Sequence, residues 1–128
     1  MKHLLYFLPL LLLSLACQQG HSQGVPVLAP KAFQQGLKPG VQLLDVRTAG
    51  EYAQGRIAGS KQIDMRNSDF VAQVKQTFDP AKPVYIYCLS GIRSASAAKA
   101  LRSAGFTQIY DLQGGLRYWS QAGLPITK

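Results

Sequence analysis

The segment VYIYCLSGIRS, residues 84–94, changes character twice along its length. Its first four residues are apolar without polar alternation, which is typical of a central strand covered by helices on both faces. Cys88 follows directly, and a glycine-containing loop then leads into an Ala-rich segment that predicts a helix over residues 94–104, ended by Gly105. Cys88 therefore stands at the carboxyl end of a strand and just before a helix. In open parallel sheets this edge is where ligands bind.

Strand-like runs recur on both sides of this segment. Residues 41–46 and 108–112 are mainly apolar and bounded by turn residues, and shorter strands are expected at residues 25–28 and 60–63. Helix-like segments separate these runs. The alternation predicts an α/β fold whose central, mostly parallel sheet is flanked by helices on both faces.

Two further helices carry local signals of their own. Thr48 and Glu51 have the spacing of a capping box, which predicts that a short helix starts there. Asn67 is placed to cap a helix that reaches about Thr77. The apolar residues of that helix recur at helical spacing and predict a stripe that faces the core: Phe70, Val71, Val74 and Phe78.

The first residues differ in character from the rest of the chain. An unbroken apolar run covers residues 4–16, and its 13 residues fall short of the roughly 20 that span a bilayer. Residues 1–16 are therefore predicted to be a secretion signal. A polar linker at residues 17–24 and a single domain at residues 25–128 are expected to follow.

Cys17 gives the leader a second interpretation. Residues 14–17, SLAC, resemble the lipobox of bacterial lipoproteins, in which the cysteine is lipidated and becomes the mature N-terminus. Ser14 and Ala16 also satisfy the small-x-small rule of ordinary signal peptidase, which leaves a soluble product with a free Cys17. Both outcomes predict an exported, periplasmic protein, and the first adds a membrane anchor through the Cys17 lipid. Since the chain has two cysteines, lipidation makes Cys88 the sole thiol, which favours a reactive role.

The amino-acid composition limits the classes of binding partner that are expected. The net charge is +8, but Lys and Arg are scattered and no basic run is interleaved with aromatic residues, so nucleic acid is not expected. The excess positive charge favours small anions or an acidic membrane surface. Because His3 and His21 lie in the leader and the linker, neither a metal site nor a cofactor is predicted. A monomer is expected.

The residues after Cys88 favour a nucleophilic thiolate. Unpaired N–H groups at the start of the following helix, together with the helix dipole, stabilise an anion at the centre of the loop. Gly91 permits the tight curvature that turns N–H groups inward, and Arg93 brings a permanent positive charge close by. Taken alone, Cys88 is as well explained as a buried core cysteine. Gly91 and Arg93 favour the reactive role, because a core cysteine requires neither.

The segment from Tyr87 to Ser94 resembles the active-site loop of single-domain rhodaneses. Further motifs agree with that family: LLDVR at residues 43–47 with Glu51 and Tyr52, GRIAGS at residues 55–60, and DLQGGL at residues 111–116 with Trp119, expected to be a core anchor. The resemblance covers about residues 25–126 and implies a sulfurtransferase. Cys88 would take a sulfur atom from thiosulfate, a persulfide or a polysulfide and pass it to a thiol or cyanide. The implied partners are small sulfur-containing anions or protein persulfides.

The resemblance also implies which residues form the site. Cys88 is the catalytic residue, and the substrate-binding loop consists of Leu89, Ser90, Gly91, Ile92, Arg93 and Ser94. The loop amides and Arg93 would stabilise the persulfide and hold the donor. Thiosulfate-specialised members carry Arg or Lys at the positions of Leu89 and Ser90. Persulfides or polysulfides are therefore expected to be better donors than thiosulfate.

Asp45 and Arg47 also leave the carboxyl end of a strand and are expected beside this loop. Asp45 either supports the loop amides or Arg93, or is a turn or helix-start residue. Arg47 is expected to pair with Glu51 four residues on, and a contribution to the positive potential at the rim is the other interpretation.

Other classes of function stay open at this point. Cysteine-dependent phosphatases and arsenate reductases use the same thiolate at a helix start, but they place one residue more between Cys and Arg than this chain has between Cys88 and Arg93. The shorter cradle favours a single sulfur atom over a phosphoryl group. Rhodanese folds also serve as non-catalytic binding modules, which usually lack the nucleophile. A persulfide carrier that docks a partner protein would keep the chemistry and change the role.

Overall fold

The computed structural model describes residues 24–128, so the predicted secretion signal, Cys17 and all but the last residue of the predicted linker lie outside the described part. The described residues form β1 (Val27–Leu28), α1 (Pro30–Gly36), β2 (Gln42–Asp45), α2 (Ala49–Gln54), β3 (Lys61–Gln62), α3 (Phe70–Thr77), β4 (Val84–Tyr87), α4 (Ile92–Ser103), β5 (Ile109–Leu112) and α5 (Gly115–Gln121). All strand pairings in their sheet are parallel, in the order β1-β5-β4-β2-β3. The predicted α/β fold and its five strands are confirmed.

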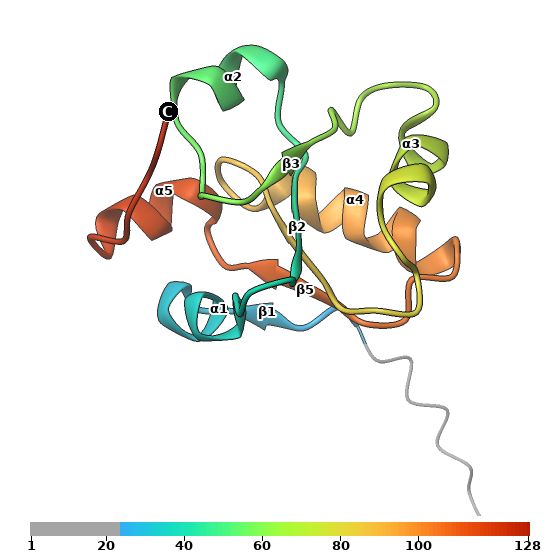
Figure 1. Cartoon of the computed structure of the whole chain (residues 1–128), viewed down its shortest axis with the longest axis horizontal. Helices are drawn as coiled ribbons and strands as arrows, with labels where there is room; N and C mark the ends of the chain where they lie inside the picture. The colour runs from blue at the N-terminus through green and yellow to red at the C-terminus, as the bar shows by residue number, and fades with distance from the viewer. Residues whose placement is uncertain (1–23) are drawn as a thin grey trace, which may run out of the picture.

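Helices cover both faces of the sheet (Figure 1). Side chains of β4 alternate between the faces, so Val84 and Ile86 belong to the core beneath α3 and α4. Tyr87 points the other way and joins Trp119 in the core beneath α1 and α5. By the same alternation Cys88 lies on the α3/α4 side. The prediction that Trp119 anchors the last helix is confirmed, because only 2% of this residue is exposed.

The start of α2 agrees with the sequence pattern. The Thr48 hydroxyl accepts a hydrogen bond from the Glu51 backbone N–H at 3.1 Å, and Glu51 Oε1 accepts one from the Thr48 N–H at 3.3 Å. This capping box satisfies two N–H groups that the first helical turn leaves free. The helix gives way to extended backbone at Gly55.

The predicted start of α3 was wrong by two residues. The helix begins at Phe70, and its N-cap is Asp69 instead of Asn67. Asn67 belongs to a preceding turn, since its N–H donates to the Asp64 carbonyl and its own carbonyl accepts from the Phe70 N–H. Asp64 favours that turn because its carboxylate also accepts the Arg66 N–H at 2.9 Å. The predicted apolar stripe is confirmed, with Val71 only partly buried.

Helix α4 begins earlier than the Ala-rich pattern indicates. Ile92 and Arg93 already belong to its first turn, and Gly91 is the N-cap with φ +98°. Such a left-handed conformation favours glycine. Gly105 follows the helix with φ +106°, so its predicted role in ending α4 is confirmed. Helix α1 was not predicted, although Pro30 at its first position is a start signal.

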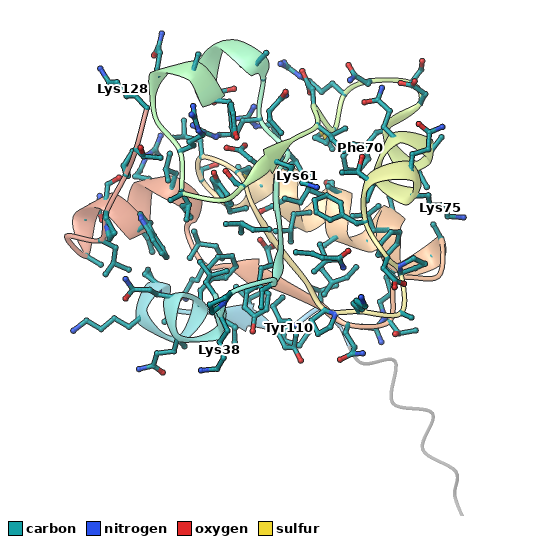
Figure 2. All side chains as sticks on the ribbon, in the orientation of Figure 1. Lys38, Lys61, Phe70, Lys75, Tyr110 and Lys128 are labelled. Carbon is teal, nitrogen blue, oxygen red and sulfur yellow. The ribbon has the colours of Figure 1, made fainter. Side chains whose placement is uncertain are left out.

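The last residues of the chain return to α2. Arg56 and Thr127 form an antiparallel bridge with two backbone hydrogen bonds of 2.9 Å. Trp119 Nε1 also donates to the Pro125 carbonyl at 2.9 Å. Lys128 accordingly lies beside α2 (Figure 2). Within residues 24–128, no helix has the length and apolar character needed to cross a membrane.

Candidate active site

Cys88 is fully buried at the end of the central strand β4. The Gly91 N–H donates a hydrogen bond to Cys88 Sγ at 3.0 Å. Because Gly91 is also the N-cap of the twelve-residue helix α4, the sulfur lies at the positive end of that helix. This arrangement agrees with the predicted inward-turned N–H and suits a sulfur that carries negative charge.

The backbone of the loop is fixed from a second side by the start of α5. The Leu116 N–H donates to the Cys88 carbonyl at 2.8 Å, and the Arg117 N–H donates to the Leu89 carbonyl at 3.0 Å. Helix α5 approaches so closely that a Cβ on Gly115 would lie 2.5 Å from the Cys88 carbonyl oxygen. Gly114-Gly115 in the sequence therefore marks a contact with the active-site loop, which glycine alone allows.

Arg93 is bound to a carboxylate in α2. Its Nη1 and Nη2 donate to Glu51 Oε1 and Oε2 at 2.8 and 2.9 Å. Hydrogen bonding from Arg93, assisted by Thr48, lowers the pKa of Glu51 to about 2, and Glu51 in turn raises the pKa of Arg93. Sequence patterns predict the capping role of Glu51 but not its pairing with Arg93, because that partner lies 42 residues away.

Asp45 and Arg47 form a buried ion pair, so both residues differ from their predicted contacts. Arg47 Nη2 donates to Asp45 Oδ2 at 2.6 Å and to the Gly55 carbonyl at 2.7 Å, and Asp45 Oδ1 accepts the Arg47 backbone N–H at 2.9 Å. The predicted pairing of Arg47 with Glu51 was wrong, because Arg93 holds that carboxylate. Of the two interpretations of Asp45, support of the loop amides or Arg93 was wrong, whereas a turn residue agrees with its hydrogen bond from the Arg47 N–H.

The other predicted loop residues differ in exposure. Leu89 and Gly91 are half-buried, Ser90 is exposed, and 76% of Ile92 is exposed. Ser94 is fully buried, and its hydroxyl donates to the Gly91 carbonyl at 3.3 Å. The predicted loop residues are thus brought together around Cys88, but the positions that point outward are uncharged.

Tyr87 fixes the strand end next to Cys88. Its hydroxyl donates to Ser60 Oγ at 3.0 Å and accepts the Ile57 N–H at 3.1 Å. Burial raises the pKa of Tyr87, so the hydroxyl stays protonated and continues to donate its hydrogen bond to Ser60. The Ser60 hydroxyl in turn donates a hydrogen bond to the Ile57 carbonyl at 2.7 Å.

Asp111 is a second buried carboxyl near the start of α4. It lies opposite Ile86 in the sheet, and its Oδ1 has no hydrogen-bond partner. Burial raises the pKa of Asp111 to about 6, against the opposing effects of the Ser94 hydroxyl and the Leu112 backbone N–H. An aspartate within a strand carries no signal of such burial by itself, so this role of Asp111 was not predicted from the sequence.

Two of the hollows in the described part of the chain bear on the site. A cleft of about 290 Å³ lies beside the loop of residues 88–94, here called the Cys88 loop. Leu89, Leu116 and Ile126 are among the residues that line this cleft. A larger cavity of about 570 Å³ lies at the amino end of β2, where Lys38 and Lys61 line it. No residue of the Cys88 loop lines that larger cavity. Among residues 24–128 there is also no group of three or more metal-ligating His, Cys, Asp or Glu side chains.

Comparison with known proteins gives one consistent family. The sequence profile of the Rhodanese-like domain matches residues 29–122. Thiosulfate sulfurtransferase GlpE of Pseudomonas paraeruginosa is 36% identical over 93 residues, which cover 72% of this chain and 81% of the relative. Thiosulfate sulfurtransferase 16, chloroplastic, of Arabidopsis thaliana is 36% identical over 98 residues, 70% of this chain and 82% of the relative.

A solved structure agrees with these sequence relatives. The crystal structure of a rhodanese-related protein from Thermoplasma volcanium superposes with a TM-score of 0.69 at 27% identity. The superposition covers 80% of this chain and 97% of that protein. The resemblance drawn from the motifs around Cys88 is therefore confirmed for the fold.

Proposed function

Because the chain belongs to the rhodanese-like domain family, we propose that it is a sulfurtransferase that carries a sulfane sulfur as a persulfide on Cys88. The observation that carries this proposal is the 3.0 Å hydrogen bond from the Gly91 N–H to Cys88 Sγ at the start of α4. A helix N-terminus stabilises a thiolate before the reaction and a persulfide anion after it. The similarity to two thiosulfate sulfurtransferases supports the same chemistry.

The proposed reaction has two displacement steps. In the first, the Cys88 thiolate attacks the outer sulfur of a donor, a new S–S bond forms at Sγ, and the electron pair of the broken bond leaves with the rest of the donor. In the second, a thiol or cyanide attacks the same outer sulfur and the Cys88 thiolate is the leaving group. Neither step needs an added oxidant or metal. The sulfur atom is transferred with six valence electrons, and in each step the leaving group keeps the electron pair of the bond that breaks.

Arg93 has an indirect role in this proposal. Its guanidinium donates two hydrogen bonds to Glu51, so it fixes α2 against the loop and is not free to bind both oxygens of a donor. The same pairing argues against the phosphatase alternative, in which an arginine must hold the transferred oxyanion. The presence of Cys88 argues against a non-catalytic binding module, while a persulfide carrier would share the first step.

Mass spectrometry of the intact protein tests the proposal. After incubation with inorganic polysulfide and removal of excess donor, wild-type protein should gain the mass of one sulfur atom on Cys88. Cys88→Ser should show no gain. Ser103→Ala serves as the matched control, since Ser103 is an exposed serine at the far end of α4, outside the loop, and should still allow loading.

Two results would reject the sulfurtransferase. One is the absence of a sulfur adduct on wild-type protein with polysulfide, thiosulfate and an organic persulfide alike. The other is an adduct that persists in Cys88→Ser. Transfer of the Cys88-bound sulfur to added cyanide or a thiol then separates the two roles. An enzyme repeats the transfer over many turnovers, whereas a carrier loads once.

We further propose that the chain is exported to the periplasm, with the Cys17 lipid as its anchor. The support is the leader sequence alone, since residues 1–23 lie outside the described part of the structure. The intact mass of the N-terminal peptide from cells tests this, because a lipidated Cys17, a free Cys17 and an uncleaved Met1 differ in mass.

A further inference from the structure

We propose that the cleft beside the Cys88 loop selects organic persulfides, R–S–SH with an apolar substituent R, as the sulfur donors. This inference rests on the proposed sulfurtransferase function and adds the substrate class. Three features carry it: the apolar walls of the cleft, the attachment of the wall formed by Ile126, and the pairing of Arg47 and Arg93 with carboxylates.

The walls of the cleft are mainly hydrocarbon. Leu89, the residue directly after Cys88, forms one side, and Leu116 and Ile126 form the others. The polar side chains that also line it are Gln54, Arg47 and Glu51, and the two charged ones are each held in an ion pair. A volume of about 290 Å³ is larger than a thiosulfate ion needs and accommodates a substituent of several carbon atoms.

Ile126 is held in place although only Thr127 and Lys128 follow it in this sequence. The Arg56–Thr127 bridge fixes the residue that follows it, and the Trp119 indole fixes the Pro125 carbonyl before it. A Cβ on Gly55 would lie 3.1 Å from Ile126 Cγ2, so the side chain rests on the backbone at the end of α2. The wall is therefore part of the fold and is present before a donor binds.

Two arginines of the site, Arg47 and Arg93, are each paired with a carboxylate. Arg47 is paired with Asp45 and Arg93 with Glu51, so two guanidinium groups face two carboxylates. The side chains of the first pair are at most 4% exposed, and the second pair is joined by two hydrogen bonds. Neither arginine has an excess of positive charge to offer an anionic donor.

This pairing disfavours thiosulfate more than an organic persulfide. Thiosulfate brings two negative charges toward a thiolate, and repulsion between like charges must be offset by nearby cations. An organic persulfide brings at most one charge, and its substituent gains free energy by leaving water for the cleft. The cleft thus compensates with apolar contact for the cations that the loop lacks.

The transfer step balances for this donor. The Cys88 thiolate attacks the outer sulfur of R–S–SH and forms the Sγ–S bond. The S–S bond of the donor breaks, and its electron pair leaves on the inner sulfur as R–S⁻. The proton stays on the transferred sulfur, so the products are Cys88–S–SH and the thiolate R–S⁻.

Rates of sulfur loading with a series of alkyl persulfides test the inference. The intact protein is mixed with methyl, propyl or hexyl persulfide, and the second-order rate constant for the Cys88 adduct is measured by quenched mass spectrometry. The rate is expected to rise by roughly twofold to threefold per methylene, because each group leaves water for the cleft. Thiosulfate is expected to be slower than all three persulfides.

The variant Ile126→Ala tests whether Ile126 forms the wall of the cleft that contacts the substituent of the donor. The hexyl-to-methyl rate ratio should fall about fivefold, since the alanine removes much of the apolar surface on that side. Val27→Ala is the matched control, because Val27 is 59% exposed in β1 and does not line the cleft. Its rate ratio should equal that of the wild type.

Failure of this inference is distinct from failure of the proposed function. If polysulfide loads Cys88 but alkyl persulfides of all lengths react equally fast, the cleft selects nothing and only the inference is rejected. An unchanged rate ratio in Ile126→Ala rejects it too, and circular dichroism shows whether that variant is folded. If no donor loads Cys88, the sulfurtransferase itself is rejected.

Discussion

The carboxylate of Glu51 and the guanidinium of Arg93 are joined by two hydrogen bonds of 2.8 and 2.9 Å, although 42 residues separate them. Glu51 also completes the capping box of α2, and Arg93 belongs to the first turn of α4. One side chain thus stabilises the start of a helix and connects that helix to the Cys88 loop. Changes at Glu51 should therefore affect both stability and sulfur loading.

Glu51→Gln should lower the free energy of unfolding by about 1–2 kcal/mol, because the neutral amide makes weaker hydrogen bonds and the partly exposed pair is already screened by solvent. Urea denaturation measures this change. Sulfur loading of Cys88 should slow in the same variant as α2 loosens. Asp79→Asn is the control, since its exposed pair with Lys82 is 4.0 Å long and should contribute less than about 0.5 kcal/mol. Equal effects of both variants would contradict a special role for Glu51.

The same pair predicts a dependence of stability on pH. The pKa of Glu51 is lowered to about 2 from 4.5, so the ionised form favours the folded state. Its contribution is fully present above pH 4.5 and is lost as the pH falls toward 2. The difference in unfolding free energy between the wild type and Glu51→Gln should therefore shrink between pH 5 and pH 2. A difference that stays constant over this range would show that the pair does not cause it.

Asp111→Asn should stabilise the protein at alkaline pH. The pKa of Asp111 is raised from 3.8 to about 6, so folding favours the protonated carboxyl. Its favourable effect is present below pH 3.8 and is lost as the pH rises through 6. An amide of the same shape carries no charge to bury, so the gain should be about 1–3 kcal/mol at pH 8 and near zero at pH 3.5. Denaturation curves at the two pH values measure it, and a gain of equal size at both would contradict the titration of Asp111.

Gly115→Ala should disrupt the active-site loop. Its Cβ would lie 2.5 Å from the Cys88 carbonyl oxygen, and its φ of +61° is strained for alanine. A loss of more than about 3 kcal/mol is expected, with a loss of sulfur loading. Gly123→Ala has a similar φ of +75° but no atom within 4 Å of the added Cβ, so it should cost only about 1 kcal/mol. If the two variants were equally stable, the close contact of α5 with the loop would be of no consequence.

Local signals in the sequence were sufficient for the sheet and for the Cys88 loop. The apolar residues of β4, the glycine at the start of α4 and the capping box of Thr48 all act within a few residues of one another. Contacts between distant segments were not predictable in this way. Glu51 has cations both at Arg47 and at Arg93, and only the fold decides that Arg93 is its partner.

One of the errors was avoidable from the sequence. Asp45 and Arg47 are two residues apart at a strand end, so their side chains leave the same face and can pair. Pairing at a spacing of four applies to helices, and Arg47 lies before the first residue of α2. The buried, unpartnered carboxyl of Asp111 had no comparable signal, because its burial depends on the packing of α4 on β5 and on the pairing of β1 with β5.

The position of Ile126 bears on where this domain ends. The family profile stops at residue 122, yet the indole N–H of Trp119 finds its acceptor at Pro125 and the backbone of Arg56 finds its partner at Thr127. A fragment cut at the family boundary would keep every motif of the sequence and lose these three hydrogen bonds. The stretch matched by the family profile is therefore smaller than the folded unit, and Ile126, which lies beyond it, forms one wall of the cleft.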